Sequence, residues 1–160
     1  MKPILKYRGG KSKEIPNYIS LVPKFDIYHE PFFGGGATYF YLEPQKAFIS
    51  DINNNLINFY KEISGINFDD IKIDLCNIQL QYENNRKIYL SQKLQFPNKR
   101  VDDPNERLYY RIRDMFNNKI ESEFNRAAIY YFINKTSYSG MIRFNSRGEF
   151  NVPYGRYANF

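Results

Sequence analysis

The sequence predicts an α/β protein that begins as a doubly wound unit and continues as a mainly helical region ending in a β-hairpin. A short buried strand leads into a glycine turn at residues 34–36, and a helix and a second strand ending at Asp51 follow. This order of strand, glycine turn, helix and strand is how doubly wound folds begin. Near the end of the chain, alternating apolar and polar residues flank a turn containing Gly148, which predicts a hairpin over residues 141–152.

The other expected elements follow from the spacing of apolar residues and from the positions of proline and glycine. Strands are expected over residues 26–30 and 47–50. Helices are expected over about residues 11–20, 37–42, 53–63, 70–82, 86–94, 106–116 and 123–134. The clearest loop is the stretch 96–105, which contains two prolines. We therefore expect an α/β part over residues 1–65 and a helical part with the hairpin over residues 66–160.

The predicted hairpin has two different faces, because side chains alternate along a strand. The apolar face would carry Ile142, Phe144, Phe150 and Val152. The polar face would carry Arg143, Asn145 and Asn151. The polar face is thus free to contact a ligand or solvent.

Composition narrows the class of protein. A chain of 160 residues with 15 Tyr and 14 Phe suits about one well-packed domain. The single cysteine, Cys76, excludes an intramolecular disulfide, and His29 is the only histidine, so we expect neither a zinc site nor any other metal centre. No apolar run has transmembrane length and no N-terminal signal pattern is present, so we expect a cytoplasmic protein without membrane contact.

The net charge of +6 is unevenly distributed along the chain. Residues 1–24 and residues 125–160 are both basic, whereas residues 25–124 carry more acids than bases. If the two ends meet in space they form one basic face of the kind that binds a polyanion. A solvated surface of a basic protein explains the charge equally well.

The glycine turn and Asp51 indicate a pocket for a nucleoside cofactor. Gly34 and Gly36 let the backbone approach a ligand that a Cβ would displace. Asp51, at the end of the second strand, can accept hydrogen bonds from both ribose hydroxyls. The third glycine of a dinucleotide fingerprint is replaced by Tyr39, which argues against NAD.

A second motif precedes the first strand and reads Lys6-Tyr7-Arg8-Gly9-Gly10-Lys11. We expect Lys11 to lie in the first turn of a helix, where free backbone N–H groups favour a carboxylate. Tyr7 offers an aromatic face to the same ligand. A phosphate-binding P-loop is excluded because neither its glycine spacing nor its Lys-Ser/Thr pair is present.

These motifs, in this order, resemble those of the Dam-type (D12 class) DNA adenine-N6 methyltransferases and of the similar enzymes of GATC-specific restriction systems. In that family Lys-Trp/Tyr-x-Gly-Gly-Lys is followed by Glu-Pro-Phe-x-Gly-x-Gly, a strand-ending Asp and a helical target-recognition region. This chain has Glu30-Pro31-Phe32-Phe33-Gly34-Gly35-Gly36 at the second position. The resemblance continues through the closing stretch from Ser139 to Tyr157, with Ser139 where the family usually has Asn.

The resemblance implies a partial Rossmann-like fold that binds S-adenosylmethionine (SAM), with a mainly helical DNA-recognition region and a β-hairpin. It implies that SAM is contacted by Tyr7, Lys11, Gly34, Gly36 and Asp51. It implies that double-stranded DNA is contacted by Lys6, Tyr138, Met141, Arg143, Asn145, Arg156 and Tyr157. From its place on the polar face, Arg143 could pair bidentately with guanine, although phosphate contact or solvation would also suit Arg143 and Arg156.

The Asp/Asn-Pro-Pro-Tyr/Phe motif, with which this family holds the adenine amino group, does not occur in the chain. Asn151-Val152-Pro153-Tyr154 is no substitute, because it belongs to the hairpin match and has one proline. Two interpretations stay open: the N-terminal part of a bacterial or phage methyltransferase for a GATC-like site, with the catalytic half on another chain, or a DNA-binding remnant that no longer methylates. A different nucleotide-binding enzyme fits less well. In either case no catalytic residue is assigned to this chain.

Overall fold

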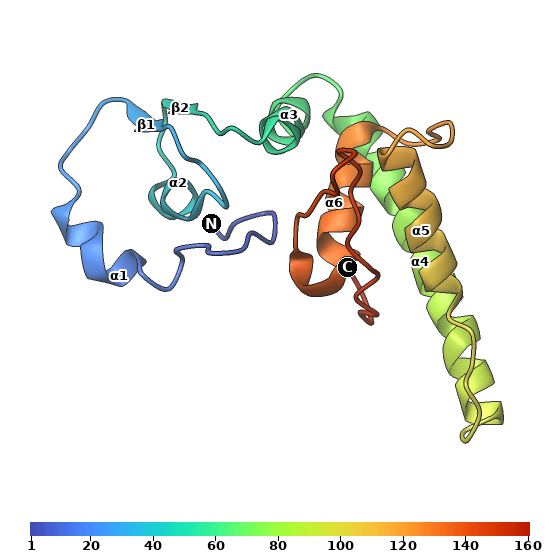
Figure 1. Ribbon diagram of the computed structural model, residues 1–160. Helices are drawn as coiled ribbons and strands as arrows, with labels where there is room; N and C mark the ends of the chain where they lie inside the picture. The colour runs from blue at the N-terminus through green and yellow to red at the C-terminus, as the bar shows by residue number, and fades with distance from the viewer.

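The computed structural model describes residues 1–160 and has six α-helices and a small sheet (Figure 1). The α/β part contains α1 (Ile15–Tyr18), the 3-10 turn η1 (Ile19–Leu21), β1 (Tyr28–Glu30), α2 (Ala37–Leu42), β2 (Ala47–Ile49) and α3 (Asn54–Ile63). The helical part contains α4 (Phe68–Gln95), α5 (Pro104–Phe116), α6 (Arg126–Thr136) and the 3-10 turn η2 (Tyr138–Gly140). The expected α/β class is therefore confirmed as a mixed architecture, while the doubly wound topology and the division at residue 65 stay predictions.

The sheet consists of two parallel strands, β1 and β2, with Tyr28 opposite Ala47 and Glu30 opposite Ile49. Both strands were expected and are shorter than expected. The side chains of Tyr28, Glu30, Ala47 and Ile49 are half-buried. On the opposite face His29 and Phe48 are exposed and stack on each other, with ring centroids 5.0 Å apart. The sheet is thus covered on one face only.

The glycine turn connects β1 to α2 and requires glycine for steric reasons. Gly34 and Gly36 have φ values of 50° and 66°, in the left-handed region that favours glycine. A Cβ on Gly36 would lie 2.4 Å from Cζ of Phe33, a buried ring of the core. The turn therefore depends on Gly36 for its own packing as well as for its backbone conformation.

The long helix α4 replaces the two helices expected over residues 70–82 and 86–94. The expectation of two helices was wrong, because residues 68–95 contain neither proline nor glycine and nothing interrupts the helix until Pro97. The buried residues of α4, which are Ile71, Ile78 and Tyr82, all lie within its first 15 of 28 residues. Its second half continues past the body of the protein.

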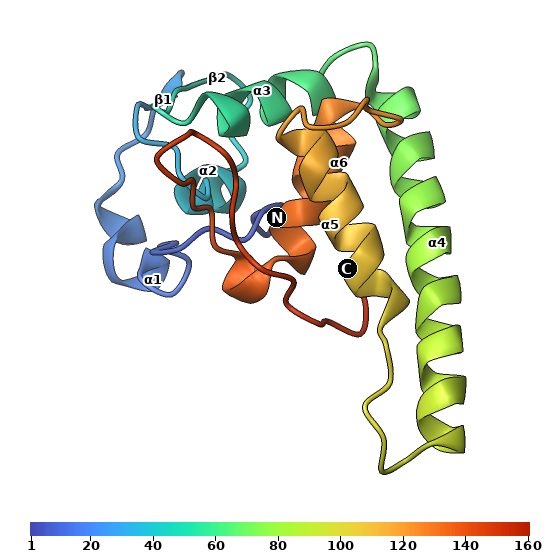
Figure 2. The same ribbon diagram turned by 45° about the vertical axis from the view of Figure 1, so that its right-hand side comes forward.

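The helices α5 and α6 pack against α4 and against each other, and α6 lies at the centre of the molecule (Figure 2). Side chains of Asp103 and Asn125 accept hydrogen bonds from backbone N–H groups at the first turns of α5 and α6, which fixes where these helices begin. Eight of the eleven residues of α6 are buried, since α6 contacts both α3 and the other long helices. The hydrophobic core is therefore continuous from the α/β part to the helical part.

The expected helix over residues 11–20 is reduced to the single turn of α1 and the 3-10 turn η1. Residues 11–14 form a separate turn in which the Glu14 N–H donates to the Lys11 carbonyl oxygen at 2.8 Å. Pro16 permits a helix only from its own first turn onward, because its ring fixes φ and removes a donor. Lys11 consequently lies four residues before the first helix.

The predicted hairpin forms with little regular strand structure. Phe144 and Phe150 make one antiparallel bridge, and the Asn151 N–H donates to the Arg143 carbonyl oxygen at 3.1 Å. The apolar face is confirmed for Phe150 and Val152, which are buried, and for Ile142, which packs partly buried against the core. Phe144 is 38% exposed and lies edge-on against Phe150.

The helices of the model are too short or too polar to span a bilayer. The residues that could ligate a metal ion form no group of three or more.

Candidate functional site

The two N-terminal motifs line one cavity of about 220 Å³. Its walls include four of the five residues that the sequence assigns to the cofactor: Tyr7, Lys11, Gly34 and Gly36. A Cβ on Gly34 would lie 3.3 Å from the Tyr7 ring, so the glycine turn and the aromatic ring are in close contact. A larger cavity of about 670 Å³ shares the walls formed by Tyr7, Gly9 and Gly10. The two cavities thus adjoin at Tyr7, Gly9 and Gly10.

The fifth predicted residue, Asp51, lies behind the glycine turn and does not line the smaller cavity. Its Oδ2 accepts a hydrogen bond from the Gly34 N–H at 2.8 Å, and its Oδ1 accepts one from the Asn53 N–H at 2.9 Å. Each carboxylate oxygen retains a free lone pair, because a carboxylate has about four acceptor positions. Asp51 therefore fixes the turn and can still accept from a ligand.

Lys11 is exposed and lines the cavity, but its surroundings differ from the expected ones. Because α1 begins at Ile15, Lys11 does not lie in the first turn of a helix. The prediction that helix N–H groups assist Lys11 is wrong for this reason. The Lys11 ammonium group can still bring positive charge to the cavity, without the help of helix N–H groups.

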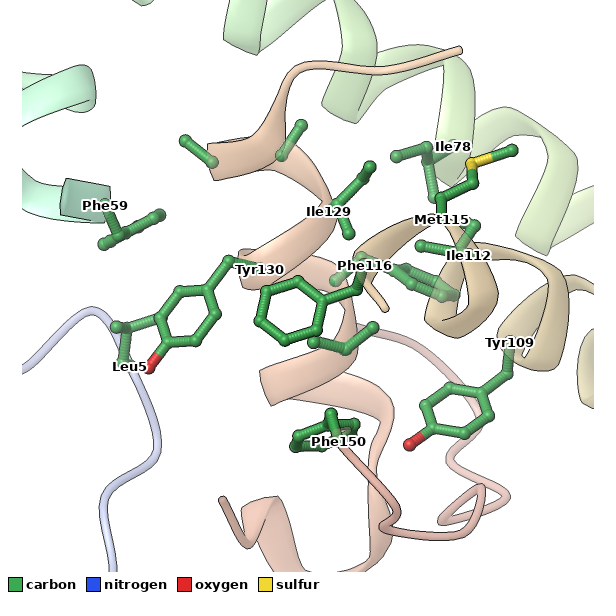
Figure 3. Close-up of a cluster of buried hydrophobic side chains, with 14 of the residues drawn as sticks. Leu5, Phe59, Ile78, Tyr109, Ile112, Met115, Phe116, Ile129, Tyr130 and Phe150 are labelled. Atoms are coloured by element: carbon green, nitrogen blue, oxygen red, sulfur yellow. The ribbon is translucent and has the colours of Figure 1, made fainter. Parts of the chain in front are cut away.

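Tyr130 on α6 reaches from the helical part toward the α/β part. It is 3% exposed, and its hydroxyl makes no hydrogen bond (Figure 3 shows the hydroxyl beside Leu5). Burial raises the pKa of Tyr130, and so do the nearby Tyr7 and Asp51, while the neighbouring Asn53 lowers it. Burial raises the pKa of Tyr7 as well, followed by the charge of Asp51. These groups form one polar cluster behind the cavity.

The backbone of Lys6 is held by Asn134, which lies one helical turn after Tyr130 on α6. The Lys6 N–H donates to Asn134 Oδ1 at 2.8 Å, and Asn134 Nδ2 donates to the Lys6 carbonyl oxygen at 2.8 Å. Asn134 is 1% exposed. Its side-chain amide satisfies both backbone groups of Lys6, as the backbone of a neighbouring strand would. This pair positions the residue directly before Tyr7.

The Lys6 side chain makes contacts within the protein. Its Nζ donates to the Lys135 carbonyl oxygen at 2.7 Å and lies 3.9 Å from the centre of the Tyr157 ring. Burial lowers the pKa of Lys6, and burial followed by the charge of Lys6 lowers the pKa of Lys135. The side chain of Lys6 also packs against Gly140. A Cβ added to Gly140 would lie 2.6 Å from the Cβ of Lys6. Lys6 therefore joins the first motif to η2 and to the closing stretch.

The polar face of the hairpin holds Arg143 at the surface. Its Nε donates to Asn151 Oδ1 at 2.8 Å, and Arg143 remains exposed. The Asn145 side chain is used within the turn, where Oδ1 accepts from the backbone N–H groups of Arg147 and Glu149 and Nδ2 donates to Glu149. The hydrogen bond from Asn145, followed by that from Lys119, lowers the pKa of Glu149. Arg143 is the residue of this face that is both oriented and open to a partner.

The remaining predicted DNA residues lie around η2 and the closing stretch. Tyr138 is 56% exposed, while Met141 and Tyr157 are half-buried. Arg156 donates to Glu106 Oε2 at 2.8 Å and is otherwise exposed. A cavity of about 410 Å³ is lined by Met141 and Ser139 together with Lys6, Tyr7 and Arg8. Tyr7 consequently borders both this cavity and the cavity at the glycine turn.

Sequence reasoning missed Asn134 and Tyr130. Both lie in a helix of mainly apolar residues, and a lone buried asparagine there indicates a specific hydrogen-bond partner. Their spacing of four places them on one face of α6. The partner, Lys6, is 128 residues away along the chain. The spacing of Tyr130 and Asn134 indicates that they share one face of α6. Only the structure shows that this face contacts the segment around Lys6.

The cavity at the glycine turn and the exposed Arg143 on the hairpin are the two features of the structure to compare with known proteins. Residues 7–160 match the model of the D12 class N6 adenine-specific DNA methyltransferases. The chain belongs to this family.

Proteins similar in sequence to this chain carry names that are consistent with this family. The chain is 38% identical to the Type II methyltransferase M.MjaIII of Methanocaldococcus jannaschii, an alignment that covers 99% of this chain and 54% of the relative. It is 36% identical to the Type II methyltransferase M1.LlaDCHI of Lactococcus lactis subsp. cremoris, with 99% and 49% covered. It is 28% identical to the DNA adenine methylase of Escherichia coli, with 98% and 48% covered. The chain thus spans about half the length of these relatives.

Replacing Asn134 by Ala should destabilise the protein, because the N–H and carbonyl groups of Lys6 lose their partners. We expect the free energy of unfolding to fall by about 2–4 kcal/mol in a urea titration. Asn77→Ala on the exposed surface of α4 is the matched control and should change it by less than about 0.5 kcal/mol. Equal stability of the two variants would show that the Lys6–Asn134 pair is energetically unimportant.

Proposed function

We propose that this chain binds SAM and a GATC-like site in double-stranded DNA for methylation of adenine N6. The observation that carries this proposal is the cavity lined by both N-terminal motifs, with Asp51 hydrogen-bonded to the turn behind it. Family membership supports the reaction, and the whole reaction requires residues beyond those assigned here.

The residues around the cavity fit the chemistry of SAM. The Tyr7 ring offers an apolar face, Asp51 keeps acceptor positions for ribose hydroxyls, and Lys11 supplies positive charge for the methionine carboxylate. When bound, SAM supplies the methyl group. The residues of this chain would orient it: Gly34 and Gly36 allow close approach, and Asp51 holds the turn against Asn53.

The proposed DNA contacts divide into two kinds. Arg143 on the hairpin is the candidate for reading guanine, because an oriented guanidinium can donate two parallel hydrogen bonds to O6 and N7. The other predicted residues would position the duplex without carrying most of the specificity: Lys6, Tyr138, Met141, Asn145, Arg156 and Tyr157. Lys6 and Asn145 already have partners within the protein, so they would act by holding Tyr157 and the hairpin turn in place.

The contact between the two substrates would run through Lys6 and Tyr7. Lys6 is fixed by α6 and lies under the ring of Tyr157, and Tyr7 borders both cavities. A target base turned out of the duplex could then approach the cofactor along the cavity between Tyr7 and Met141. Ser139, which has a positive φ, also lines this cavity.

We also propose that the chain by itself does not transfer the methyl group. The residues assigned here bind SAM or DNA, and none is placed to accept hydrogens from the adenine amino group. A further segment carrying an Asp-Pro-Pro-Tyr motif would complete the site. The second candidate is a DNA-binding protein without methylation, which the exposed Arg143 on the hairpin would suit equally well.

The first test concerns Asp51. Asp51→Asn removes the charge and leaves one acceptor oxygen, so SAM affinity measured by calorimetry should fall about ten- to a hundredfold. Asp26→Ala, an exposed acid of the same part, is the control and should bind as the wild type does. Unchanged affinity of Asp51→Asn, with an unchanged melting temperature, would contradict the assignment of Asp51.

The second test compares two arginines of the hairpin. Arg143→Ala should lose about 1–3 kcal/mol of the preference for a GATC duplex over a scrambled duplex. Arg147→Ala removes the same charge from the turn and should weaken binding to both duplexes equally. If both variants keep the preference, Arg143 does not read a base.

The third test measures methyl transfer from tritiated SAM to GATC-containing DNA. The purified chain should give no incorporation above background, because proximity alone leaves the adenine amino group without its acceptors. Incorporation should begin when a polypeptide carrying the Asp-Pro-Pro-Tyr half is added. Transfer by the chain alone would overturn this part of the proposal, and binding of both substrates without transfer under any addition would favour the non-catalytic candidate.

A further inference from the structure

The second half of α4 and the loop after it form an arm that extends beyond the rest of the protein, here called the α4 arm (residues 84–101). Both views show it reaching past the other helices (Figures 1 and 2). No residue between Tyr82 and Asp103 is buried, so the arm has no part in the hydrophobic core. A helix that continues for several turns beyond the core gains little from packing, and its surface is available to a partner.

The α4 arm is strongly basic. Between Glu83 and Asp102 the sequence contains no acid, whereas it contains five bases. These are Arg86, Lys87, Lys93, Lys99 and Arg100. This excess of positive charge is not evident from the net charge of the central part of the chain, because that part as a whole contains more acids than bases. None of the five has an acidic partner in the structure, where the ion pairs involve other residues.

The base of the α4 arm is attached to the closing stretch. The Tyr82 hydroxyl donates to the Tyr157 carbonyl oxygen and lies 2.6 Å from the Tyr154 hydroxyl. Arg156 is paired with Glu106 at the start of α5, close to where the arm returns. Asn105 Nδ2 donates to the Tyr82 carbonyl oxygen at 3.0 Å and joins the two ends of the arm. The arm therefore begins where two of the proposed DNA contacts, Arg156 and Tyr157, are located.

The charge of the α4 arm decides between two kinds of partner. It also exposes Leu90 and Leu94, of which Leu94 is 83% exposed, and such residues could contact another protein. Five bases without an acid, however, are complementary to a phosphate backbone, and each neutralised phosphate releases counterions. A protein partner would need a matching acidic surface, and nothing in this structure indicates one.

We propose that the α4 arm binds the phosphate backbone of duplex DNA on one flank of the recognition site. This inference rests on the proposed function, since it takes the duplex to be held at Arg156 and Tyr157. Its contribution is independent of sequence, because phosphate contacts position the protein without reading bases. The arm lengthens the bound stretch of DNA beyond what the hairpin covers.

The test uses the full chain and removes three charges from the α4 arm by the substitutions Lys87→Gln, Lys93→Gln and Arg100→Gln. The control removes three exposed charges elsewhere by Lys24→Gln, Lys46→Gln and Lys72→Gln. Dissociation constants are measured by fluorescence anisotropy at several salt concentrations. The probes are a GATC duplex of about one helical turn and one of about three turns.

On the long duplex, the arm variant should bind about tenfold more weakly, and the slope of log K against log salt should fall by about 2.7. On the short duplex, the arm variant, the control and the wild type should agree within about twofold, because the flank is missing. The preference for GATC over a scrambled site should stay unchanged in the arm variant. Melting temperatures close to that of the wild type would exclude a folding defect.

The outcomes separate the α4 arm from the proposed function. If the wild type prefers GATC duplexes and the arm variant matches the control on the long duplex, the inference about the arm is wrong and the proposed function stands. If the wild type binds no duplex, both are wrong. If the arm variant instead alters the oligomeric state in light scattering with unchanged DNA affinity, the arm contacts protein and the inference is overturned.

Discussion

The arrangement of the whole molecule depends on the reciprocal pair of hydrogen bonds between Asn134 and the backbone of Lys6. Asn134 is buried in the middle of α6, and through it the helical part fixes the segment that leads into Tyr7. A buried amide that satisfies both groups of one residue is specific, because breaking the pair would leave four polar groups without these partners. The first motif therefore has one register relative to α6.

Several other contacts depend on the position of Lys6 relative to α6. The Lys6 ammonium reaches the Lys135 carbonyl oxygen and the Tyr157 ring, so the closing stretch is held by the same residue. Gly140 has to be glycine partly because the Lys6 side chain fills the space of its Cβ. Tyr7, the next residue, packs against the glycine turn that Asp51 holds. Direct contacts thus connect the cavity at the glycine turn to η2 and to Tyr157 near the end of the chain.

The α/β part receives much of its support from outside the sheet. Parallel sheets are normally covered on both faces, but here His29 and Phe48 stack in the open, and Phe32 is 89% exposed. Phe33 and Phe40 pack within this part, against Tyr60 of α3, and α3 in turn contacts α6, where Phe59 lies near Tyr130. The helix α3 therefore connects the α/β part to α6.

The sequence alone determined the local features: the two strands, the glycine turn, the helices α2 and α3, and the motifs that identify the family. These depend on residues close together in the chain, such as Gly34 and Gly36 with positive φ or the apolar spacing before Ile63. The unbroken helix α4 and the late start of α1 also have local causes, namely the lack of Pro and Gly in residues 68–95 and the position of Pro16. Only the tertiary structure decided that the second half of α4 extends beyond the core and that Asn134 on α6 holds the backbone of Lys6. These depend on contacts between distant segments, such as the 128 residues that separate Lys6 from Asn134. Local sequence restricts backbone conformation, whereas the choice of a distant partner depends on the burial of a whole core, which no local pattern encodes.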